Sequence, residues 1–167
     1  MKAWYTIHTK PRQESVAEEH LQRQGFTVYL PRIQATRRQK DRWQETIEPL
    51  FPRYLFIYTN PEEQNLAPIR STRGVSKLVR FGNQLIPVPE VLIEAVKERA
   101  DPETGWLVPE SPLFKPGDRV AILEGPFAEL EGIFHCEQGE QRALILLEVL
   151  GKLTNLTVSR HNLTRAS

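Results

Sequence analysis

Histidine and cysteine are the side chains most often used for nucleophilic catalysis or metal binding, and the 167-residue chain contains few of them. The four histidines, His8, His20, His135 and His161, lie far apart and lack the spacing of metal ligands. Cys136 is the single cysteine, which excludes an intramolecular disulfide and fits a reducing cytosol. The sequence also has no Gly-rich phosphate loop, no G-x-S-x-G and no H-E-x-x-H. We therefore expect a protein that is not an enzyme and that uses no metal or cofactor.

Basic side chains are concentrated in the first half of the chain. Residues 1–88 carry 14 Lys and Arg against 8 Asp and Glu, a balance of +6, whereas residues 89–167 carry 8 against 13, a balance of −5. This asymmetry suggests that only the first half meets nucleic acid and that the two halves attract each other. Chance surface composition is an equally open explanation.

The sequence shows no signal peptide and no membrane segment. The first residues, MKAWYTIHTKP, lack the apolar core of a signal peptide. No apolar run approaches the ~20 residues that a membrane helix needs. We expect a cytoplasmic, monomeric protein without membrane contact.

The stretch YLFIYT shows the alternation of a strand. Neighbouring side chains of a strand point to opposite faces, so Tyr54, Phe56 and Tyr58 share one face while Leu55 and Ile57 share the other. Both faces are apolar, so each needs a cover. The helices of the same domain would cover one face and need not cover the other.

The surrounding pattern predicts an α+β domain over residues 1–100. Pro11 suits the first turn of a helix that Gly25 ends, and a short helix opens at Asn60 and is limited by Pro68. The expected sheet is mixed or antiparallel, with helices packed on one side. We predict strands at 3–9, 26–33, 54–59, 75–81 and 85–88, a polar, basic hairpin tip at 34–45, and long helices at 10–25 and 89–100.

Beyond this domain the composition changes. Pro102, Pro109 and Pro112 make residues 101–112 an extended, semi-rigid linker. Residues 113–167 are divided by glycines into short pieces, a pattern typical of a small all-β barrel. Their stretch KPGDRVAILEGPFAELEGIF resembles the KOW motif of small barrels that bind RNA or ribosomal proteins.

Three further stretches carry a family resemblance. WYTIHTKPRQE, EPLFPRYLFI and TRGVSKLVRFG, followed by the linker and the KOW motif, resemble the NusG family of transcription elongation factors over nearly the whole chain. They look most like the RfaH branch, the specialised antiterminators. The resemblance implies a factor that binds RNA polymerase and the non-template DNA strand, reduces pausing and termination, and couples transcription to translation through its C-terminal domain.

In this family the N-terminal domain binds the clamp helices of the polymerase β′ subunit through an apolar patch. An aromatic cluster with a polar rim is typical of partner-binding surfaces. The β subunit is a further contact in the RfaH branch, but the matching triplet Asn65-Leu66-Ala67 departs from the pattern of that branch. The positions that match the clamp-binding patch are Phe51, Pro52, Tyr54, Phe56, Phe81, Ile93 and Val96.

The RfaH branch also reads the non-template strand in the paused polymerase. Lys and Arg neutralise phosphates, while Gln, His and Arg reach base edges or stack on unpaired bases. Val16 departs from the branch, because it occupies a helix position where a basic residue is expected. The matching positions and their basic neighbours are Lys10, Arg12, Gln13, His20, Arg70, Thr72 and Arg73.

The resemblance implies two forms of the C-terminal domain, a β-barrel and an α-helical hairpin packed on the polymerase-binding face. Glu48 and Arg142 match a pair that bridges the domains in the closed, helical form. Pro126 would fall inside the first helix, where an interior proline costs ~3 kcal/mol, so we predict the barrel as the intrinsic fold. In the family this barrel recruits ribosomal protein S10, and Phe127 and Leu150 occupy plausible contact positions.

Other functions remain open on the sequence alone. A general NusG factor would act at most genes and would need no specific DNA element. A ribosome-associated KOW protein would bind RNA through the C-terminal half, although that half is acidic here. An enzyme is disfavoured by the lack of catalytic motifs.

Overall fold

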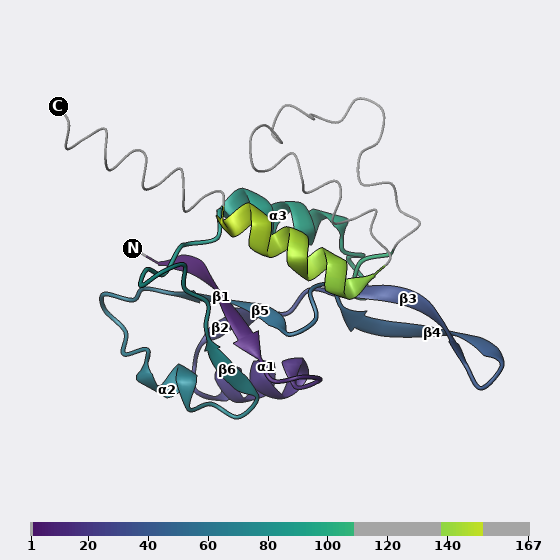
Figure 1. Ribbon diagram of the computed structural model, residues 1–167, viewed down its shortest axis with the longest axis horizontal. Helices are drawn as coiled ribbons and strands as arrows, with labels where there is room; N and C mark the ends of the chain where they lie inside the picture. Colours follow the sequence, from purple (N-terminus) through teal and green to yellow (C-terminus); the bar gives the residue numbers. More distant parts are fainter. Residues whose placement is uncertain (1, 109–137, 152–167) are drawn as a thin grey trace.

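The computed structural model of the chain describes residues 2–108 and 138–151 (Figure 1). A sheet forms the middle of the molecule, with helices on both of its faces. Residues 139–151 form a helix that we name helix 139–151. The other elements, in chain order, are β1 (Ala3–Thr9), α1 (Glu14–Arg23), β2 (Thr27–Tyr29), β3 (Arg32–Gln39), β4 (Arg42–Pro49), β5 (Tyr54–Thr59), α2 (Ala67–Arg70), β6 (Val75–Leu78) and α3 (Glu90–Arg99).

The main sheet is antiparallel in every pairing and has the strand order β2–β5–β1–β6. β5 lies inside it, and the strand predicted at 54–59 is confirmed. Paired residues of β1 and β5 share a face: Ile7 lies opposite Leu55, and Thr6 lies opposite Phe56. The sheet therefore has an aliphatic face and an aromatic face.

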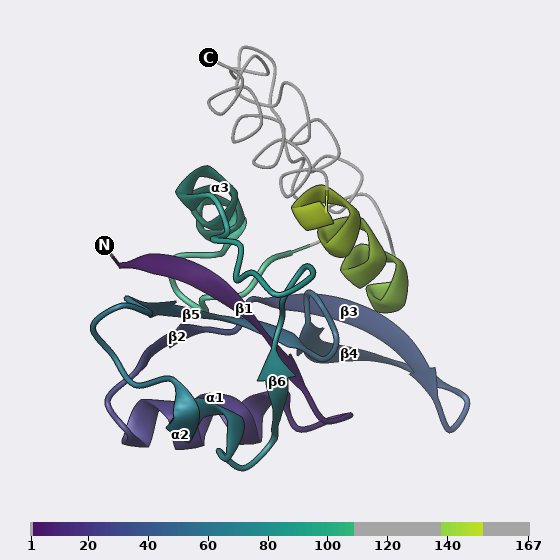
Figure 2. The same ribbon diagram turned by 60° about the vertical axis from the view of Figure 1, so that its left-hand side comes forward.

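Different helices cover the two faces of the sheet (Figure 2). α1 and α2 cover the aliphatic face, where Leu21 and Ile69 are fully buried. α3 and helix 139–151 cover the aromatic face, where Val96 and Leu146 are fully buried. The prediction of helices on one side only is therefore wrong, because the aromatic face, which includes Trp4, also has an apolar surface to bury.

The chain changes its strand partner at Pro31, which has no backbone N–H to donate. β2 ends just before it and stays in the main sheet, whereas β3 begins just after it and pairs with β4. The segment predicted as a polar hairpin tip, 34–45, is mostly strand in this ribbon. The tip itself consists of the two residues Lys40 and Asp41.

The two long predicted helices are confirmed as α1 and α3. Gly25, with φ 93°, follows α1 in the left-handed conformation that commonly ends a helix. The short helix differs from the prediction, since Pro68 lies in the first turn of α2 and the residues after Asn60 form a turn. The strand predicted at 75–81 is shortened to β6, and the one predicted at 85–88 is reduced to the single bridge between Val88 and Trp4.

The beginning of the predicted linker is fastened to the N-terminal domain. Leu107 forms a parallel bridge with Ile33. Its N–H donates to the Arg32 carbonyl at 2.8 Å, and its carbonyl accepts from Gln34 N–H at 2.8 Å. Leu107 is also buried among the residues of the aromatic face. Residues 101–107 are therefore a docked segment rather than a free spacer.

The C-terminal region is helical where the structure describes it. Helix 139–151 overlaps the stretch EQRALILLEVLGKL, residues 140–153, in which leucines repeat at helical spacing. No strand of a KOW barrel is present within residues 138–151. The rest of the predicted barrel, including Phe127, lies outside the described residues.

No helix within residues 2–108 and 138–151 is long and apolar enough to cross a membrane. The same residues contain no group of three or more His, Cys, Asp or Glu side chains that could hold a metal ion.

Candidate functional site

The aromatic face of the main sheet is the surface to which the sequence prediction points. We define it by five side chains, Trp4, Tyr29, Tyr54, Phe56 and Tyr58, which strand alternation brings to one side of β1, β2 and β5. Trp4 stacks on Tyr58 with ring centroids 5.1 Å apart and meets Tyr29 edge-on at 6.5 Å. Such contacting rings give a continuous apolar surface with hydroxyl groups at its margin.

Helix 139–151 lies over this face (Figures 1 and 2). Its inward side chains recur every three or four residues, the spacing of one helical face. Leu144, between them, is 60% exposed and marks the outer side. The four inward residues, Ala143, Leu146, Val149 and Leu150, are all buried in one cluster with Phe56.

Both ends of helix 139–151 meet residues predicted to bind polymerase. A Cβ atom added at Gly139 would lie only 2.6 Å from Pro52 Cγ, so the absence of a side chain allows this close approach. A Cβ atom at Gly151 would lie 4.0 Å from Phe81 Cε1. The helix therefore spans the predicted binding patch from one end to the other.

Arg142 fastens helix 139–151 to the N-terminal domain. Its side chain is 2% exposed, and its Nε donates a 2.7 Å hydrogen bond to the Leu50 carbonyl oxygen. Glu48, the predicted partner, accepts two hydrogen bonds from Arg37, at 2.8 and 2.9 Å. The hydrogen bond from Arg37 is the main cause that holds the pKa of Glu48 below its ordinary value. Partial burial acts in the opposite direction. The hydroxyl of Thr46 and the charge of Arg142 lower the pKa further. The charge of Arg142 thus acts on Glu48, while the Leu50 carbonyl accepts the hydrogen bond from Arg142.

α3 supplies a second part of the cover. Ile93 and Val96 are buried in the cluster of the aromatic face. The ammonium group of Lys97 lies 5.0 Å from the Trp4 ring centroid and 5.1 Å from that of Tyr29, within cation–π range. Burial raises the pKa of Tyr29 to about 12. This end of the face is therefore closed by α3.

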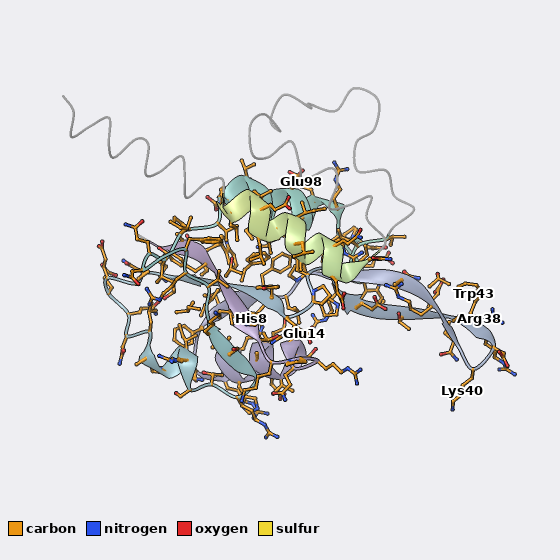
Figure 3. All side chains as sticks on the ribbon, in the orientation of Figure 1. His8, Glu14, Arg38, Lys40, Trp43 and Glu98 are labelled. Atoms are coloured by element: carbon orange, nitrogen blue, oxygen red, sulfur yellow. The ribbon has the colours of Figure 1, made fainter. Side chains whose placement is uncertain are left out.

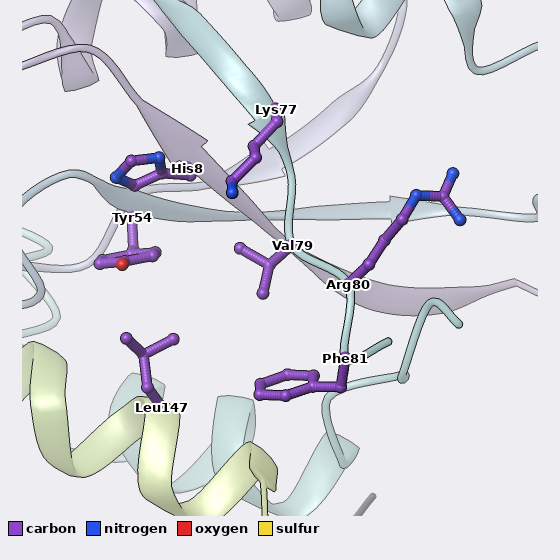
Figure 4. A pocket seen from close by; sticks show the side chains of 7 residues that line it. All are labelled: His8, Tyr54, Lys77, Val79, Arg80, Phe81 and Leu147. Carbon is purple, nitrogen blue, oxygen red and sulfur yellow. The ribbon is translucent and has the colours of Figure 1, made fainter. Parts of the chain in front are cut away.

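A cavity of about 260 Å³ remains between the sheet and helix 139–151 (Figure 4). Burial is the main cause that holds the pKa of His8 below its ordinary value, and the charges of Arg53 and Lys77 act in the same direction. His8 also packs against Tyr54, with ring centroids 5.0 Å apart. The cavity is lined by His8, Tyr54, Lys77, Val79, Arg80, Phe81 and Leu147.

The structure gathers all seven predicted polymerase-binding residues on or beside the aromatic face. Phe51 and Phe56 meet edge-on with ring centroids 6.0 Å apart. The face that the sequence predicts for a partner is already occupied by helix 139–151. Of the seven residues, Phe51, Phe56, Ile93 and Val96 are buried, and Pro52, Tyr54 and Phe81 are half-buried.

The residues predicted to bind DNA lie around α1, at the end of α2 and in the segment after α2. The backbone N–H of Lys10 donates to the Gly74 carbonyl at 2.9 Å, which joins the two segments. Thr72 is buried, accepts a 2.7 Å hydrogen bond from Gln24 Nε2 and donates one to the Pro68 carbonyl, so its hydroxyl serves internal contacts here. Lys10, Arg12, Arg70 and Arg73 are exposed, and Gln13 and His20 are half-buried.

The sequence prediction missed part of the cover. Leu144, Leu147 and Leu150 repeat at helical spacing, but the buried stripe runs through Ala143 and Val149 and could have been found by testing adjacent stripes. Leu150, predicted to contact S10, is buried against the aromatic face. In the triplet Asn65-Leu66-Ala67, which departs from the β-contact pattern of the RfaH branch, Asn65 Oδ1 accepts a 3.0 Å hydrogen bond from Ala67 N–H.

Comparisons with known proteins agree on one family. Residues 2–97 match a family model described as transcription termination factor NusG. The chain is 26% identical over 163 residues to the transcription termination/antitermination protein NusG of Thermus thermophilus, covering 86% of this chain and 89% of the relative. It is 28% identical over 180 residues to the protein of the same name from Deinococcus radiodurans, covering 90% and 92%. A solved structure titled "Domain interaction in Thermotoga maritima NusG" aligns with a TM-score of 0.36 and 25% identity over 57% of this chain and 55% of the other.

Proposed function

Because the chain belongs to the NusG family, as the match over residues 2–97 shows, we propose that it is a specialised transcription elongation factor of the RfaH type. It binds RNA polymerase and the non-template DNA strand and reduces pausing and termination. Its activity is binding, not catalysis. The C-terminal domain couples transcription to translation after its release from the aromatic face.

The observation that carries this proposal is the burial of helix 139–151 on the aromatic face. A surface with Trp4, Tyr54 and Phe56 at its centre has the composition of a protein-binding patch. In the proposed mechanism the clamp helices of the polymerase β′ subunit dock on this face. They must first displace helix 139–151, so the resting protein is autoinhibited.

Competition for one face has a quantitative consequence. If polymerase binds only the open form, the apparent dissociation constant equals the intrinsic one divided by the open fraction. Arg142 and the four inward side chains of helix 139–151 keep that fraction small. The displaced segment, with Leu150 no longer buried, then becomes available to ribosomal protein S10.

The DNA contact uses a different part of the domain. Lys10, Arg12, Arg70 and Arg73 are exposed and supply charge for phosphates. Gln13, at the start of α1, supplies a donor and an acceptor for a base edge. Helix 139–151 covers the opposite face of the sheet from α1, so the DNA contact does not compete with it.

The proposal is tested by opening the cover with one substitution. Leu146→Glu places a carboxylate in a fully buried apolar contact, which is strongly unfavourable, and helix 139–151 should leave the face. Leu144→Glu makes the same change on the exposed side of the same helix and serves as the control. We expect the Leu146→Glu chain to retain core RNA polymerase at least about tenfold better than the wild type, and the control to match the wild type.

A further substitution locates the contact. Tyr54→Ala, introduced into the open Leu146→Glu chain, should remove most of the gained retention, because Tyr54 is half-buried on the docking face. If the open chain retains no more polymerase than the control, the docking proposal is wrong.

A general NusG-type elongation factor is the second candidate. The relatives from Thermus thermophilus and Deinococcus radiodurans, which align with 86% and 90% of this chain, are termination/antitermination proteins of that name. Loading on polymerase distinguishes the two functions. A specialised factor loads only on complexes that carry a particular non-template DNA element, whereas a general factor loads without it.

A further inference from the structure

The β3–β4 ribbon extends away from the rest of the molecule and carries a large exposed aromatic ring near its end (Figures 1 and 3). Trp43 is 71% exposed, more than any other large hydrophobic side chain in the described part of the chain. A largely exposed indole offers a flat apolar ring to a partner, and Trp is one of the residues enriched at binding hot spots. Neither the polymerase face nor the α1 surface accounts for it.

The ribbon holds its end in a defined position. β3 and β4 pair without a register shift from Arg32–Pro49 to Gln39–Arg42. The turn residues Lys40 and Asp41 have φ of 50° and 64°, the positive values of a type I′ turn, which matches the twist of a hairpin. Along the ribbon, Arg37, in the outer half of β3, makes two hydrogen bonds to Glu48 near the root. The tip is therefore a preorganised surface.

Positive charge surrounds Trp43. Arg38 lies directly opposite it in the register, so both side chains point to the same face of the ribbon. Residues 38–43 contain three cations and one carboxylate, Asp41. The Arg38–Asp41 pair is 3.8 Å apart with side chains 66% and 97% exposed, so solvent and salt screen it strongly. Figure 3 shows Arg38, Lys40 and Trp43 together at this end of the molecule.

We propose that the hairpin tip is a second nucleic-acid contact that binds single-stranded DNA. An unpaired base stacks on Trp43, and the flanking phosphates lie against Arg38, on the same face of the ribbon, and Lys40 in the turn. Single-stranded DNA fits better than a duplex, because the faces of paired bases are already stacked. It fits better than a protein surface, because the ring at the tip is a single aromatic side chain and the exposed charged residues within 38–45 are three cations against two carboxylates, Asp41 and Glu45.

The inference rests on the proposed function, because the DNA strand that contacts α1 in that function is the strand that also reaches the hairpin tip. Arg32, at the root of β3, donates to Glu18 of α1 at 2.8 Å and lies 3.5 Å from the Ser15 hydroxyl. The root of the ribbon therefore adjoins the helix that carries Gln13 and His20. A single DNA strand bound beside α1 can therefore continue along the β3–β4 ribbon to its tip.

The experiment measures binding of the full chain to a fluorescently labelled thymidine oligonucleotide, a duplex of the same length and an RNA of the same length. Trp43→Ala should weaken binding of the single-stranded DNA about 5- to 150-fold, because stacking of a base on an aromatic ring is lost. Trp43→Phe should keep most of the binding. Ile47→Ala is the matched control, since Ile47 is also exposed on the same face of the ribbon and should have no effect.

The salt dependence of the affinity for single-stranded DNA separates the contribution of the Trp43 ring from that of the cationic side chains. Trp43→Ala should lower the affinity equally at all salt concentrations, whereas Arg38→Gln, on the same face of the ribbon, should reduce the salt slope by about 0.7, the value of one phosphate contact on a single strand. Thermal unfolding of Trp43→Ala should match the wild type, because the ring is exposed.

Four outcomes would overturn the inference. These are no single-strand binding by the wild type, equal affinities of Trp43→Ala and Ile47→Ala, an equal loss of duplex binding in Trp43→Ala, or a loss confined to RNA. The double variant Lys10→Gln/Arg73→Gln alters the α1 surface. It therefore distinguishes failure of the hairpin-tip inference from failure of the proposed function. If this double variant loses DNA binding and Trp43→Ala does not, the α1 surface stands and only the tip is rejected.

Discussion

One sheet presents two faces that are covered in different ways. On the aliphatic face, Leu55 and Ile57 pack against Ala17 and Leu21 of α1, a helix that follows β1 directly. On the aromatic face, part of the cover comes from helix 139–151. The hydrogen bond from Arg142 to the Leu50 carbonyl joins residues 92 positions apart in the sequence. The first cover is adjacent in sequence to a strand of the sheet, whereas the second is far from the sheet in sequence.

The composition of the two faces fits this difference. The aliphatic face is dominated by branched side chains, which suit permanent burial. The aromatic face is rich in Trp, Tyr and Phe, which are enriched at protein interfaces. In Trp and Tyr, the apolar ring packs against a partner while the N–H or O–H group can bond to water or to the partner. Tyr54 and Tyr58 are half-buried even under the cover. A domain can therefore keep one core intact while it exchanges the cover of the other.

The largest expected effect lies on the aliphatic face. Leu21→Ala removes a fully buried side chain and should lower the free energy of unfolding of the domain by about 2–5 kcal/mol. Urea unfolding followed by fluorescence measures this change. A loss below about 1 kcal/mol would contradict the description of this face as a permanent core.

The matching change on the aromatic face should act locally. Leu146→Ala removes the same side chain from an equally buried site, but it should destabilise only the closed cover, by about 2–5 kcal/mol. Amide hydrogen exchange should become faster in residues 139–151 while the urea midpoint of the sheet stays unchanged. An equal fall of the midpoint in both variants would mean that the two faces form one core.

The buried Arg142 makes a smaller contribution to the same cover. Arg142→Met keeps the apolar stem but leaves the Leu50 carbonyl without this donor, which should cost the closed form about 1–3 kcal/mol. Protease cleavage within residues 138–151 measures the opening. Glu140→Gln, an exposed change in the same helix, is the control and should cleave at the wild-type rate.

The smallest effect is a dependence on pH at the root of the hairpin. The pKa of Glu48 is lowered mainly by the Arg37 hydrogen bond, so the ionised form stabilises the fold above the ordinary carboxyl pKa. That contribution should be lost as pH falls below ~4.3 and through the lowered pKa. Glu48→Gln should flatten this part of the stability profile, measured by urea unfolding, whereas Glu45→Gln in the same strand should not.

The local pattern of the sequence predicted much of the first 100 residues. The alternation of residues 54–59 identified β5 and its two faces, and Gly25 marked the end of α1. Pro31 could have indicated that β2 and β3 are separate strands, because a proline cannot continue the backbone pairing. Local pattern did not reveal that α3 covers the face opposite α1, since that choice depends on which apolar surface remains open.

The candidate site was less predictable for a physical reason. The seven polymerase-docking positions came from a resemblance, and the structure brings them together. The barrel expectation rested on Pro126 and the glycines, whereas residues 139–151 are helical against the aromatic face. Helix propensity alone could not decide this, because the stabilising contacts lie far away in sequence. Trp43 gave no signal, since an aromatic residue in a strand predicts burial as readily as exposure.

The most direct test of the account locks the cover and asks whether polymerase still binds. A Cβ atom at Gly139 would touch the Pro52 ring, so a Pro52→Cys/Gly139→Cys chain with Cys136→Ser should form a disulfide between helix 139–151 and the docking face. The oxidised chain should retain no core RNA polymerase, and reduction with dithiothreitol should restore retention in the same sample. Equal retention by the oxidised and reduced chains would contradict the claim that polymerase and helix 139–151 compete for the aromatic face.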